Sequence, residues 1–344
     1  DARGLPTAAG CAGIPAYWPE EDAEAVSRLR SSGGIVLGKT VTTPLAGRDP
    51  METRNPWNLE YSPGGSSSGS GAAVADRMCL AALGTQSGGS VLRPAVYNGL
   101  VGFKPGFGTI SLRGVVPNLH EIDHVGTLTR DVQDAALMWT TLRHSAGLEP
   151  KGSGSEMPPL VEPRLPRRIW RIRDWFEQRS DPESLDAVEL VCDLVRSREL
   201  DIFEGGLPPT FAEALKSRSI ISSVGTAHFA AEHFRRKPDS FTPHLAETIE
   251  AGLEVKAIDY KQAQQHREKL RQDMGAMLEG VDLAVMPVAP QPPGKFGDLG
   301  TLDALWVSSA RFAHRPYGAR FTNWRATAGS PWTRGFITEN SGLV

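Results

Sequence analysis

Short apolar runs alternate along the chain with helical stripes of apolar residues. A helix is predicted between Pro19 and Gly33, with Ala23, Val26 and Leu29 on one side. An acidic run marks its beginning, and the glycine marks its end. The same kind of pattern predicts a strand at 35–37, a helix at 71–78, a strand at 79–83, a helix at 131–144 and a strand at 282–286. Helices and strands that alternate in this way indicate the α/β fold class with a mixed or parallel sheet.

The second half of the chain is mostly helical in its pattern. Residues 183–279 carry helical periodicity that breaks near 205–209 and at Pro238. Residues 147–166 are rich in Gly, Pro, Ser and Glu and are the best candidate for a linker or surface excursion. A proline- and glycine-rich loop follows at 287–300, and no clear periodicity is found after it.

Composition narrows the functional classes. The 344 residues are 40% hydrophobic and 22% charged, which is typical of a globular protein. The 37 Lys and Arg against 40 Asp and Glu give a net charge of −3, so no basic field attracts nucleic acid. No run of 18 apolar residues occurs, so we expect no membrane span. Three widely spaced cysteines, Cys11, Cys79 and Cys192, argue against a disulfide framework and favour a reducing, cytoplasmic setting.

Residues 33–40 (GGIVLGKT) match the pattern of a phosphate-binding loop. That motif lies between a strand and a helix, whereas here a helix is predicted before it and the apolar run 35–37 lies inside it. Thr42, Thr43 and Pro44 follow, and these residue types do not favour a helix. We therefore interpret this segment as the end of a strand, with a lysine beyond it.

Residues 120–124 (HEIDH) match H-E-x-x-H, in which two histidines one helical turn apart bind zinc and the glutamate acts as a base. Pro117 precedes the segment and Gly126 follows it, which leaves about two helical turns at most. Surface histidines near a turn are the better interpretation. A zinc protease that uses His120 and His124 stays an alternative that a chelator would test, and no metal site is predicted.

Two glycine–serine loops carry the informative chemistry. Residues 64–71 (GGSSSGSG) form the first and residues 84–90 (GTQSGGS) the second, and they flank a predicted helix and strand. Such loops expose backbone N–H groups because no side chain covers them. A serine at the end of the second loop, Ser90, can attack as a nucleophile while the preceding N–H groups hold the oxyanion.

A serine nucleophile needs a base. His120, His124 and His228 lie in no telling motif, and no G-x-S-x-G sequence surrounds Ser90. A lysine can serve if burial keeps it neutral, although neutrality at pH 7 costs about 4–5 kcal/mol. Lys39 is a candidate because it follows an apolar segment and lies between Gly and Thr.

In this combination and order, the loops and their flanking segments resemble the amidase signature family. The resemblance runs from residue 4 to residue 137 and rests on GLPT at 4–7, GKT at 38–40, RNPWN at 54–58, PGGSSSG at 63–69, GTQSGGS at 84–90, GFKP at 102–105 and DHVG at 123–126. It implies that residues 1–344 form one amidase signature domain, in which helices cover both faces of a mixed central β-sheet. Within that domain, residues 147–280 would be the variable, mostly helical region that shapes the substrate pocket.

The resemblance also implies a catalytic triad. Ser90 would be the nucleophile, Ser66 a serine that follows a cis peptide bond and relays a proton, and Lys39 the base. The oxyanion would be bound by backbone N–H groups of the three residues before the nucleophile, Ser87, Gly88 and Gly89. The implied reaction is hydrolysis of an amide C–N bond through an acyl-enzyme, with release of ammonia or an amine and without a cofactor.

Three positions depart from the commoner family pattern. Gln86 stands where many members have Asp, and Arg93 follows the nucleophile by three residues rather than two. Both resemble the malonamidase-like branch, in which such an arginine binds a substrate carboxylate, so Gln86 and Arg93 are candidates for substrate binding. A structural ion pair beside Pro94 is an equally open role for Arg93. Pro44 stands where a glutamate often follows the Thr-Thr pair, a change that bears on the loop of Lys39.

Two further functions are compatible with the resemblance. The glutamine-hydrolysing subunit of the aminoacyl-tRNA amidotransferase shares the triad and would need a partner chain, and an inactive family member would keep the residues without the activity. Because family members carry elements before 4–7 and after 287–300, we expect the chain to be incomplete at both ends. The expected partner is a small-molecule amide, without direct nucleic-acid or membrane binding, and a homodimer is left open.

Overall fold

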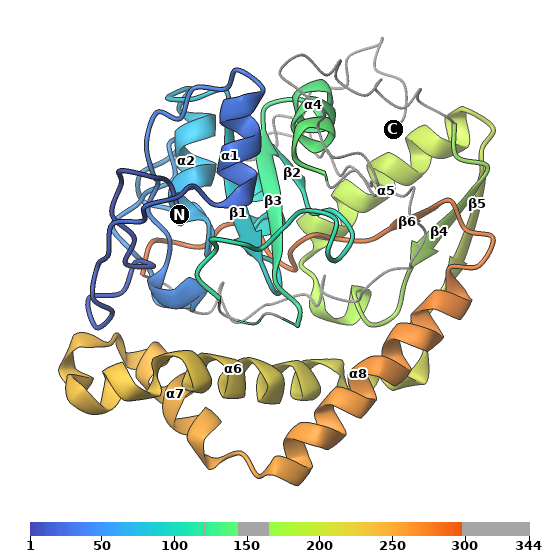
Figure 1. The fold of residues 1–344 in the computed structure, drawn as a ribbon. Helices are drawn as coiled ribbons and strands as arrows, with labels where there is room; N and C mark the ends of the chain where they lie inside the picture. Colours follow the sequence, from blue (N-terminus) through green and yellow to red (C-terminus); the bar gives the residue numbers. More distant parts are fainter. Residues whose placement is uncertain (118, 120, 144–164, 298–344) are drawn as a thin grey trace.

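The computed structural model describes residues 1–117, 119, 121–143 and 165–297, which are drawn in colour in Figure 1. Its helices are α1 (Glu24–Ser31), α2 (Ser68–Ala75), α3 (Leu92–Tyr97), α4 (Val132–Leu142), α5 (Pro182–Ser197), α6 (Ala214–Arg236), α7 (Pro243–Glu254) and α8 (Ala257–Met277). Its strands are β1 (Ala81–Gln86), β2 (Val101–Phe103), β3 (His124–Thr129), β4 (Arg168–Ile172), β5 (Asp201–Gly205) and β6 (Leu283–Val285).

The first sheet has the strand order β1-β3-β2, and β3 runs antiparallel to both of its neighbours (Figure 1). Val125 and Leu128 lie three positions apart on β3, so their side chains point to opposite faces of the sheet. Leu128 shares a core cluster with Val74 of α2 and Ala95 of α3, whereas Val125 packs with residues of α1 and α4. Helices therefore cover both faces, and the ends of the strands are the places left for polar chemistry.

The second sheet, β5-β4-β6, is parallel. Trp170 and Ile172 of β4 lie on one face and share a core cluster with Leu270 and Met274 of α8. Arg171 falls between them in the strand, so its side chain points to the other face, toward α5.

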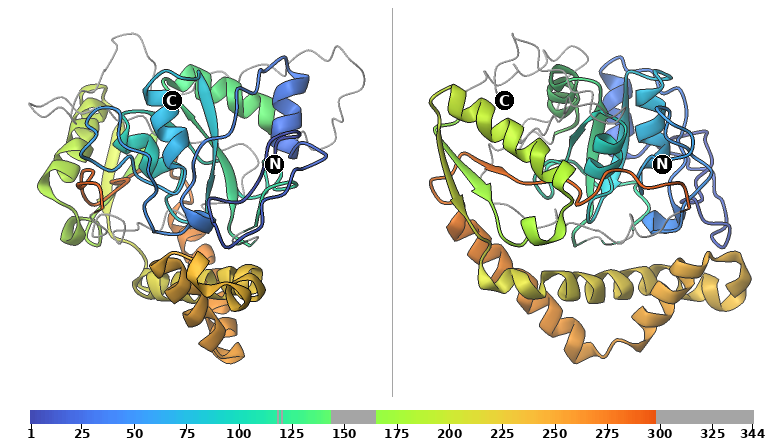
Figure 2. Two further views of the ribbon diagram at one scale, coloured as in Figure 1. Left: turned by 90° about the vertical axis from the view of Figure 1, so that its left-hand side faces the viewer. Right: turned by 180° about the vertical axis from the view of Figure 1, so that it is seen from behind.

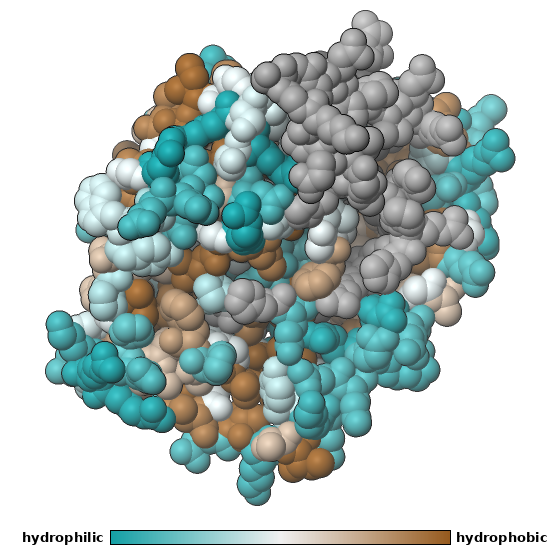
Figure 3. All heavy atoms as spheres, viewed as in Figure 1, coloured by the Kyte–Doolittle hydropathy of each residue, from teal (hydrophilic) through white to brown (hydrophobic). Residues whose placement is uncertain are grey.

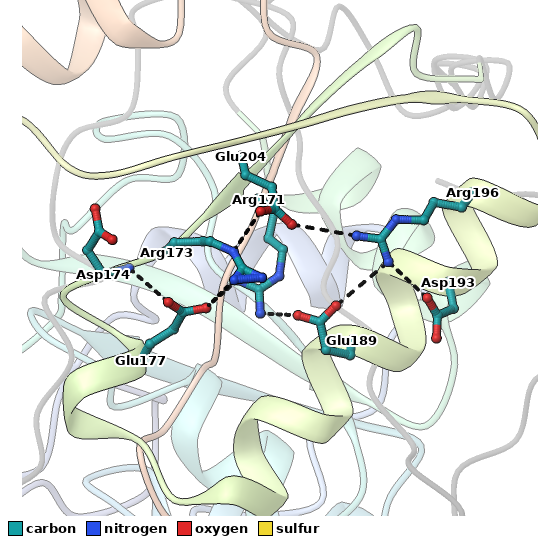
Figure 4. Close-up of polar contacts among 8 residues, drawn as sticks. All are labelled: Arg171, Arg173, Asp174, Glu177, Glu189, Asp193, Arg196 and Glu204. Carbon is teal, nitrogen blue, oxygen red and sulfur yellow. Dashed lines mark hydrogen bonds and ion pairs between the residues drawn. The ribbon is translucent and has the colours of Figure 1, made fainter.

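A network of charged side chains holds α5 against this second face (Figure 4). Arg171 is 2% exposed, and its guanidinium pairs with Glu177 at 3.2 Å and with Glu189 of α5. Arg196, at the end of α5, pairs in turn with Glu189 and with Glu204 of β5. Because a buried guanidinium left without partners is costly, these carboxylates fix the helix on the sheet.

The helices α6, α7 and α8 form a layer along one side of the two sheets, as both views in Figure 2 show. Ala230 of α6 and Ile249 of α7 are fully buried in one cluster with Cys11, Ile14 and Leu45. The N-terminal loops therefore pack on α6 and α7, and the helical layer borders the part of the chain that carries the glycine–serine loops.

The strand predicted at 35–37 is wrong. Within the described part of the chain these residues pair with no strand, and the side chains of Ile35 and Leu37 are 86% and 73% exposed. Hydrophobic residues also come to the surface in several patches of the face shown in Figure 3. An apolar run shows that a segment favours burial, but a strand forms only where a neighbouring strand satisfies its backbone groups.

Most other predicted elements are confirmed with shifted ends. The predicted helix at 71–78 is α2, the strand at 79–83 begins β1, the helix at 131–144 is α4 and the strand at 282–286 is β6. The helical region at 183–279 holds α5 to α8 with the predicted breaks, although it also contains β5, which the pattern did not indicate. The α/β class is confirmed, but the described strands form two sheets instead of one.

In the part of the chain that the structure describes, no helix is both long enough and apolar enough to cross a membrane. The predictions for 147–164 and for residues after 297 lie outside the described residues.

Candidate active site

The two glycine–serine loops meet beside the end of β1. The backbone N–H of Ser67 donates to the carbonyl oxygen of Ser90 over 3.2 Å. The Ser67 hydroxyl lies against β1, where it accepts from the N–H of Thr85 at 3.3 Å. A methyl group at Gly84 would lie 2.7 Å from this hydroxyl, so only glycine permits the approach. The loop that carries Ser66 is thereby joined to the loop that carries Ser90.

Ser66 lies directly before Ser67 in the chain and is 1% exposed. The peptide bond between Gly65 and Ser66 is cis, at the position where the resemblance predicts one. The Ser66 carbonyl oxygen accepts from the N–H of Thr43 at 3.0 Å and from the Thr42 hydroxyl at 3.1 Å. The Ser66 hydroxyl oxygen is buried and has no hydrogen-bond partner among the described residues, so its proton is free to serve a group that enters the site.

Ser90 lies in the turn between β1 and α3 and is half-buried. Gln86, the last residue of β1, shapes this turn, because its side-chain carbonyl accepts from the N–H groups of Val91 at 2.7 Å and Leu92 at 3.0 Å. Gln86 is 1% exposed, and these contacts place its carbonyl at the start of α3. The structure therefore assigns the Gln86 carbonyl to holding the turn that presents Ser90.

The glycine-rich segment before Ser90 is anchored by an aspartate. The Ser87 hydroxyl donates a hydrogen bond to one carboxylate oxygen of Asp123, and the other oxygen accepts from the N–H of Leu119 at 2.6 Å. Asp123 belongs to the DHVG segment that the resemblance singled out, although no role was predicted for it. Asp123 directly precedes β3, and the first residue of that strand, His124, pairs with Gln86. This position at the end of a strand, beside the glycine–serine loop, is the feature that could have indicated a role for Asp123.

Lys39 lies next to these loops but does not contact the Ser66 hydroxyl. Its ammonium group donates to the carbonyl oxygen of Pro6 at 2.8 Å and to the Thr7 hydroxyl at 2.6 Å. Lys39 is exposed rather than buried as the sequence argument required, and limited desolvation of its ammonium group lowers its pKa from the ordinary value. Two residues farther along, Val41 accepts from the N–H of Gly69 at 2.9 Å, which fixes the lysine segment along the start of α2. The structure thus brings the Lys39 segment to the serine loops without forming the lysine–serine hydrogen bond.

Arg93 is turned toward the cis peptide. Its Nη2 and Nε donate to the carbonyl oxygen of Gly65 at 2.6 and 3.2 Å, and the side chain is 6% exposed. Its Nη1 is buried and has no hydrogen-bond partner among the described residues. Burial lowers the pKa of the Arg93 guanidinium. The alternative role of Arg93 in a structural ion pair is not observed within the described chain, and the guanidinium donates to a backbone carbonyl instead.

A second arginine at the site was missed from the sequence. Arg218, in the second turn of α6, packs on Gly88 so closely that a methyl group there would lie 2.5 Å from Nη2. Its neighbours in the chain form no motif, and only the fold brings residue 218 to residue 88.

The structure does not form the helical arrangement that the zinc alternative at 120–124 requires, and the preferred interpretation as surface histidines is wrong for His124, which is 4% exposed. His124 begins strand β3 rather than lying on a helix, and its Nδ1 is 2.7 Å from the carbonyl oxygen of Ile122. Asp123, between the two histidines, is bound to Ser87 and Leu119. The helical turn that would bring two histidines to one ion is absent from the described residues, and no cluster of three metal-ligating side chains occurs among them. His120 itself lies outside the described residues.

Comparison with known proteins supports the resemblance that the loops suggested. The pattern of the Amidase family matches residues 1–311. The chain belongs to the amidase family. The amidase sequence is 32% identical over 332 residues to a glutamyl-tRNA(Gln) amidotransferase subunit from Geobacter sulfurreducens, an alignment that covers 86% of this chain and 68% of that protein. The corresponding amidotransferase subunit from Gloeothece citriformis is also 32% identical, with the same coverage.

Solved amidase structures share the fold. One described as an amidase superposes with a TM-score of 0.76 at 32% identity and covers 86% of this chain and 66% of its own. A structure of 6-aminohexanoate cyclic dimer hydrolase gives a TM-score of 0.75 at 25% identity, again over 86% and 66% of the two chains. The chain thus spans about two thirds of the length of these relatives.

Proposed function

We propose that this amidase hydrolyses the C–N bond of a small amide with Ser90 as the nucleophile. The observation that carries the proposal is the junction of the two loops, in which the N–H of Ser67, the residue after Ser66, donates to the carbonyl oxygen of Ser90. Membership of the amidase family supports the reaction class. A half-buried serine in one loop and a buried serine with an unpartnered hydroxyl in the adjoining loop suit a proton relay.

The proposed relay needs three residues. Ser90 passes its proton to Ser66 as its oxygen attacks the amide carbonyl carbon, and Ser66 passes its own proton to neutral Lys39. The resulting oxyanion would accept from backbone N–H groups before Ser90, and those of Ser87 and Gly89 have no acceptor among the described residues. Ser66 then returns a proton to the leaving nitrogen, the C–N bond breaks, and water releases the acid from the acyl-enzyme.

Lys39 must change partners for this relay to work. Its ammonium group binds Pro6 and Thr7, whereas the Ser66 hydroxyl has no partner among the described residues. The lowered pKa of Lys39 favours the neutral form that a base requires. A rotation of this long side chain toward Ser66 would give up the contacts with the Pro6 carbonyl and the Thr7 hydroxyl and gain a contact with the Ser66 hydroxyl.

Substrate binding is proposed to involve Arg93, through its unpartnered Nη1, and the helical region 147–280, which supplies α6 beside Gly88. Gln86 would act on the substrate only through the turn that it holds. The free cysteines Cys11, Cys79 and Cys192 support a reducing, cytoplasmic setting.

A second candidate function is that of an amidotransferase component, because the relatives from Geobacter and Gloeothece are named as subunits of glutamyl-tRNA(Gln) amidotransferase. In that case glutamine would be the amide, and its hydrolysis would depend on a partner chain. Glutaminase activity that rises when partner chains are added would support this function over hydrolysis by the chain alone.

Labelling with a fluorophosphonate, followed by peptide mass mapping, tests the proposal directly. We expect an adduct on Ser90 that is lost in Ser90→Ala and falls at least tenfold in Lys39→Ala and Ser66→Ala. Ser197→Ala is the matched control, since this exposed hydroxyl lies at the end of α5. Absence of an adduct on protein with cooperative unfolding would contradict the proposal and indicate an inactive family member.

A further inference from the structure

Helix α8 binds the segment before β3 through the carboxylate of Glu121. Oε1 of Glu121 accepts from the Tyr260 hydroxyl at 3.2 Å and from Nε2 of Gln264 at 3.0 Å. Oε2 accepts from Nη1 of Arg267 at 3.3 Å. The three donors are four and three positions apart, so they lie on one face of the helix, and we call them the α8 stripe. Burial and the neighbouring Glu121 carboxylate raise the pKa of Tyr260, so its hydroxyl stays a donor at neutral pH.

The rest of α8 is packed firmly enough to keep the α8 stripe in place. Leu270 and Met274, in the second half of the helix, are buried in the core cluster that includes residues of β4. Ala263 is 3% exposed. Nε2 of His266 lies 2.8 Å from the carbonyl oxygen of Thr210, in the segment before α6. Glu121 is therefore bound to a helix that is itself fixed in the fold.

Glu121 lies in a closed turn that ends at Asp123, and we call it the 119–123 turn. The N–H groups of Ile122 and Asp123 donate to the carbonyl oxygen of Leu119 at 2.9 and 2.8 Å. In the other direction, the N–H of Leu119 donates to the Asp123 carboxylate at 2.6 Å. Leu119 and Ile122 are both buried. Because the two ends of this turn are bonded to each other, a shift of Glu121 moves the Asp123 carboxylate with it.

The Asp123 carboxylate in turn accepts from the hydroxyl of Ser87, whose backbone N–H is one of the proposed oxyanion donors. We propose that Glu121 is a positioning residue, through which the α8 stripe holds the 119–123 turn and thereby the backbone before Ser90. The inference rests on the proposed amidase function and adds to it a helix that acts on the reaction without touching the substrate.

The exposure of the Glu121 contacts indicates where their loss would be felt. The side chains of Glu121 and Arg267 are 40% and 32% exposed, and ion pairs at such sites add little to the free energy of unfolding. A displacement of about 1 Å at a reacting group, by contrast, can lower a rate by about 100-fold. We therefore expect loss of these contacts to change the reaction at Ser90 more than it changes stability.

Labelling of Ser90 by a fluorophosphonate over a range of probe concentrations measures this effect. We expect Glu121→Ala to lower the maximal labelling rate by about fivefold and to leave the half-saturating probe concentration unchanged, because the oxyanion donors move while the probe-binding surface stays. Tyr260→Phe removes one donor of the α8 stripe and should give a smaller loss. Glu121→Gln keeps an acceptor oxygen and should recover part of the rate. Glu232→Ala is the matched control, since it removes an exposed carboxylate that is paired with an arginine on α6 and should leave the rate unchanged.

A double variant separates positioning from a general loss of stability. Ser87→Ala breaks the link between the 119–123 turn and the Ser90 loop, so adding Glu121→Ala to it should lower the rate little further. Losses that multiply in the double variant would overturn the inference, as would labelling of Glu121→Ala at the wild-type rate. Urea unfolding of each variant ensures that labelling is measured on folded protein.

Hydrogen exchange of backbone amides, followed by mass spectrometry, tests the positioning without catalysis. Glu121→Ala should speed exchange at 84–90 as well as in the 119–123 turn, whereas Glu232→Ala should leave both at the wild-type rate. Faster exchange that is confined to the 119–123 turn would overturn the inference. If wild-type Ser90 is not labelled while exchange at 84–90 still responds to Glu121→Ala, the positioning role of Glu121 stands and the proposed hydrolysis fails.

Discussion

Arg93 donates two hydrogen bonds to the carbonyl oxygen of Gly65. The residue that follows Ser90 by three positions therefore holds the peptide that leads into Ser66. The two glycine–serine loops are therefore joined at two points, by this contact and by the hydrogen bond from the N–H of Ser67 to the carbonyl oxygen of Ser90. The relative position of the two proposed catalytic serines consequently depends on a charged side chain that is 6% exposed.

Replacing Arg93 by methionine should slow the reaction even of neutral probes. Hydrogen bonds from a charged group are worth about 1.5–3 kcal/mol, so loss of the contact to Gly65 should lower the rate of fluorophosphonate labelling at Ser90 by about 10- to 100-fold. Arg93→Lys keeps a cationic hydrogen-bond donor and should recover part of the rate. Labelling at the wild-type rate in Arg93→Met would show that the contact with Gly65 does not position the serines.

The sequence indicated the two glycine–serine loops better than it indicated the packing around them. The family resemblance singled out the loops that carry Ser66 and Ser90, and the structure joins these loops through the hydrogen bond from Ser67 to Ser90. The catalytic roles of the two serines stay a prediction. The strand expected at 35–37 failed because an apolar run does not reveal whether a neighbouring strand exists. The position of Arg218 beside Gly88 could not be predicted for a related reason. It depends on how α6 packs against the loops, and no local sequence pattern indicates that packing.

The pH dependence of labelling should follow Lys39. Limited desolvation lowers the pKa of this side chain, and the neutral amine is the form that accepts a proton. The rate of labelling should therefore rise with pH and then level off. The pH at which the rate is half-maximal should lie below the ordinary pKa of lysine. The Thr7 hydroxyl accepts from the ammonium group, so Thr7→Val removes a stabiliser of the charged form and should move the midpoint to lower pH. A midpoint at or above the ordinary lysine value would argue against Lys39 as the base.

Asp123 should act on the reaction through Ser87. Asp123→Asn places an amide where the Ser87 hydroxyl donates, and loss of this charge-assisted hydrogen bond should lower the labelling rate at Ser90 by about tenfold. Ser87→Ala removes the other partner of the same bond and should have a similar effect. Because both changes break one interaction, the double variant should lose little more than either single variant. Fully multiplied losses in the double variant would show that the two residues act independently.

Lys104 should destabilise the folded protein at neutral pH. Burial lowers the pKa of its ammonium group to about 8, and its only hydrogen bond among the described residues is to the carbonyl oxygen of Pro105 at 3.0 Å. Below pH 8 the lysine is charged in both the folded and the unfolded state, so the full cost of burying the charge lowers the free energy of unfolding. Between pH 8 and the unfolded-state pKa near 10.4 the unfolded chain binds more protons than the folded chain, and this cost disappears as the pH rises.

We therefore expect Lys104→Met to raise the free energy of unfolding by about 2 kcal/mol at pH 7 and by much less at pH 10. Urea unfolding of wild type and variant at both pH values measures the difference, with Lys216→Met as the exposed control. A variant that is less stable than wild type at pH 7 would show that the Lys104 ammonium group contributes more through its contacts than its burial costs.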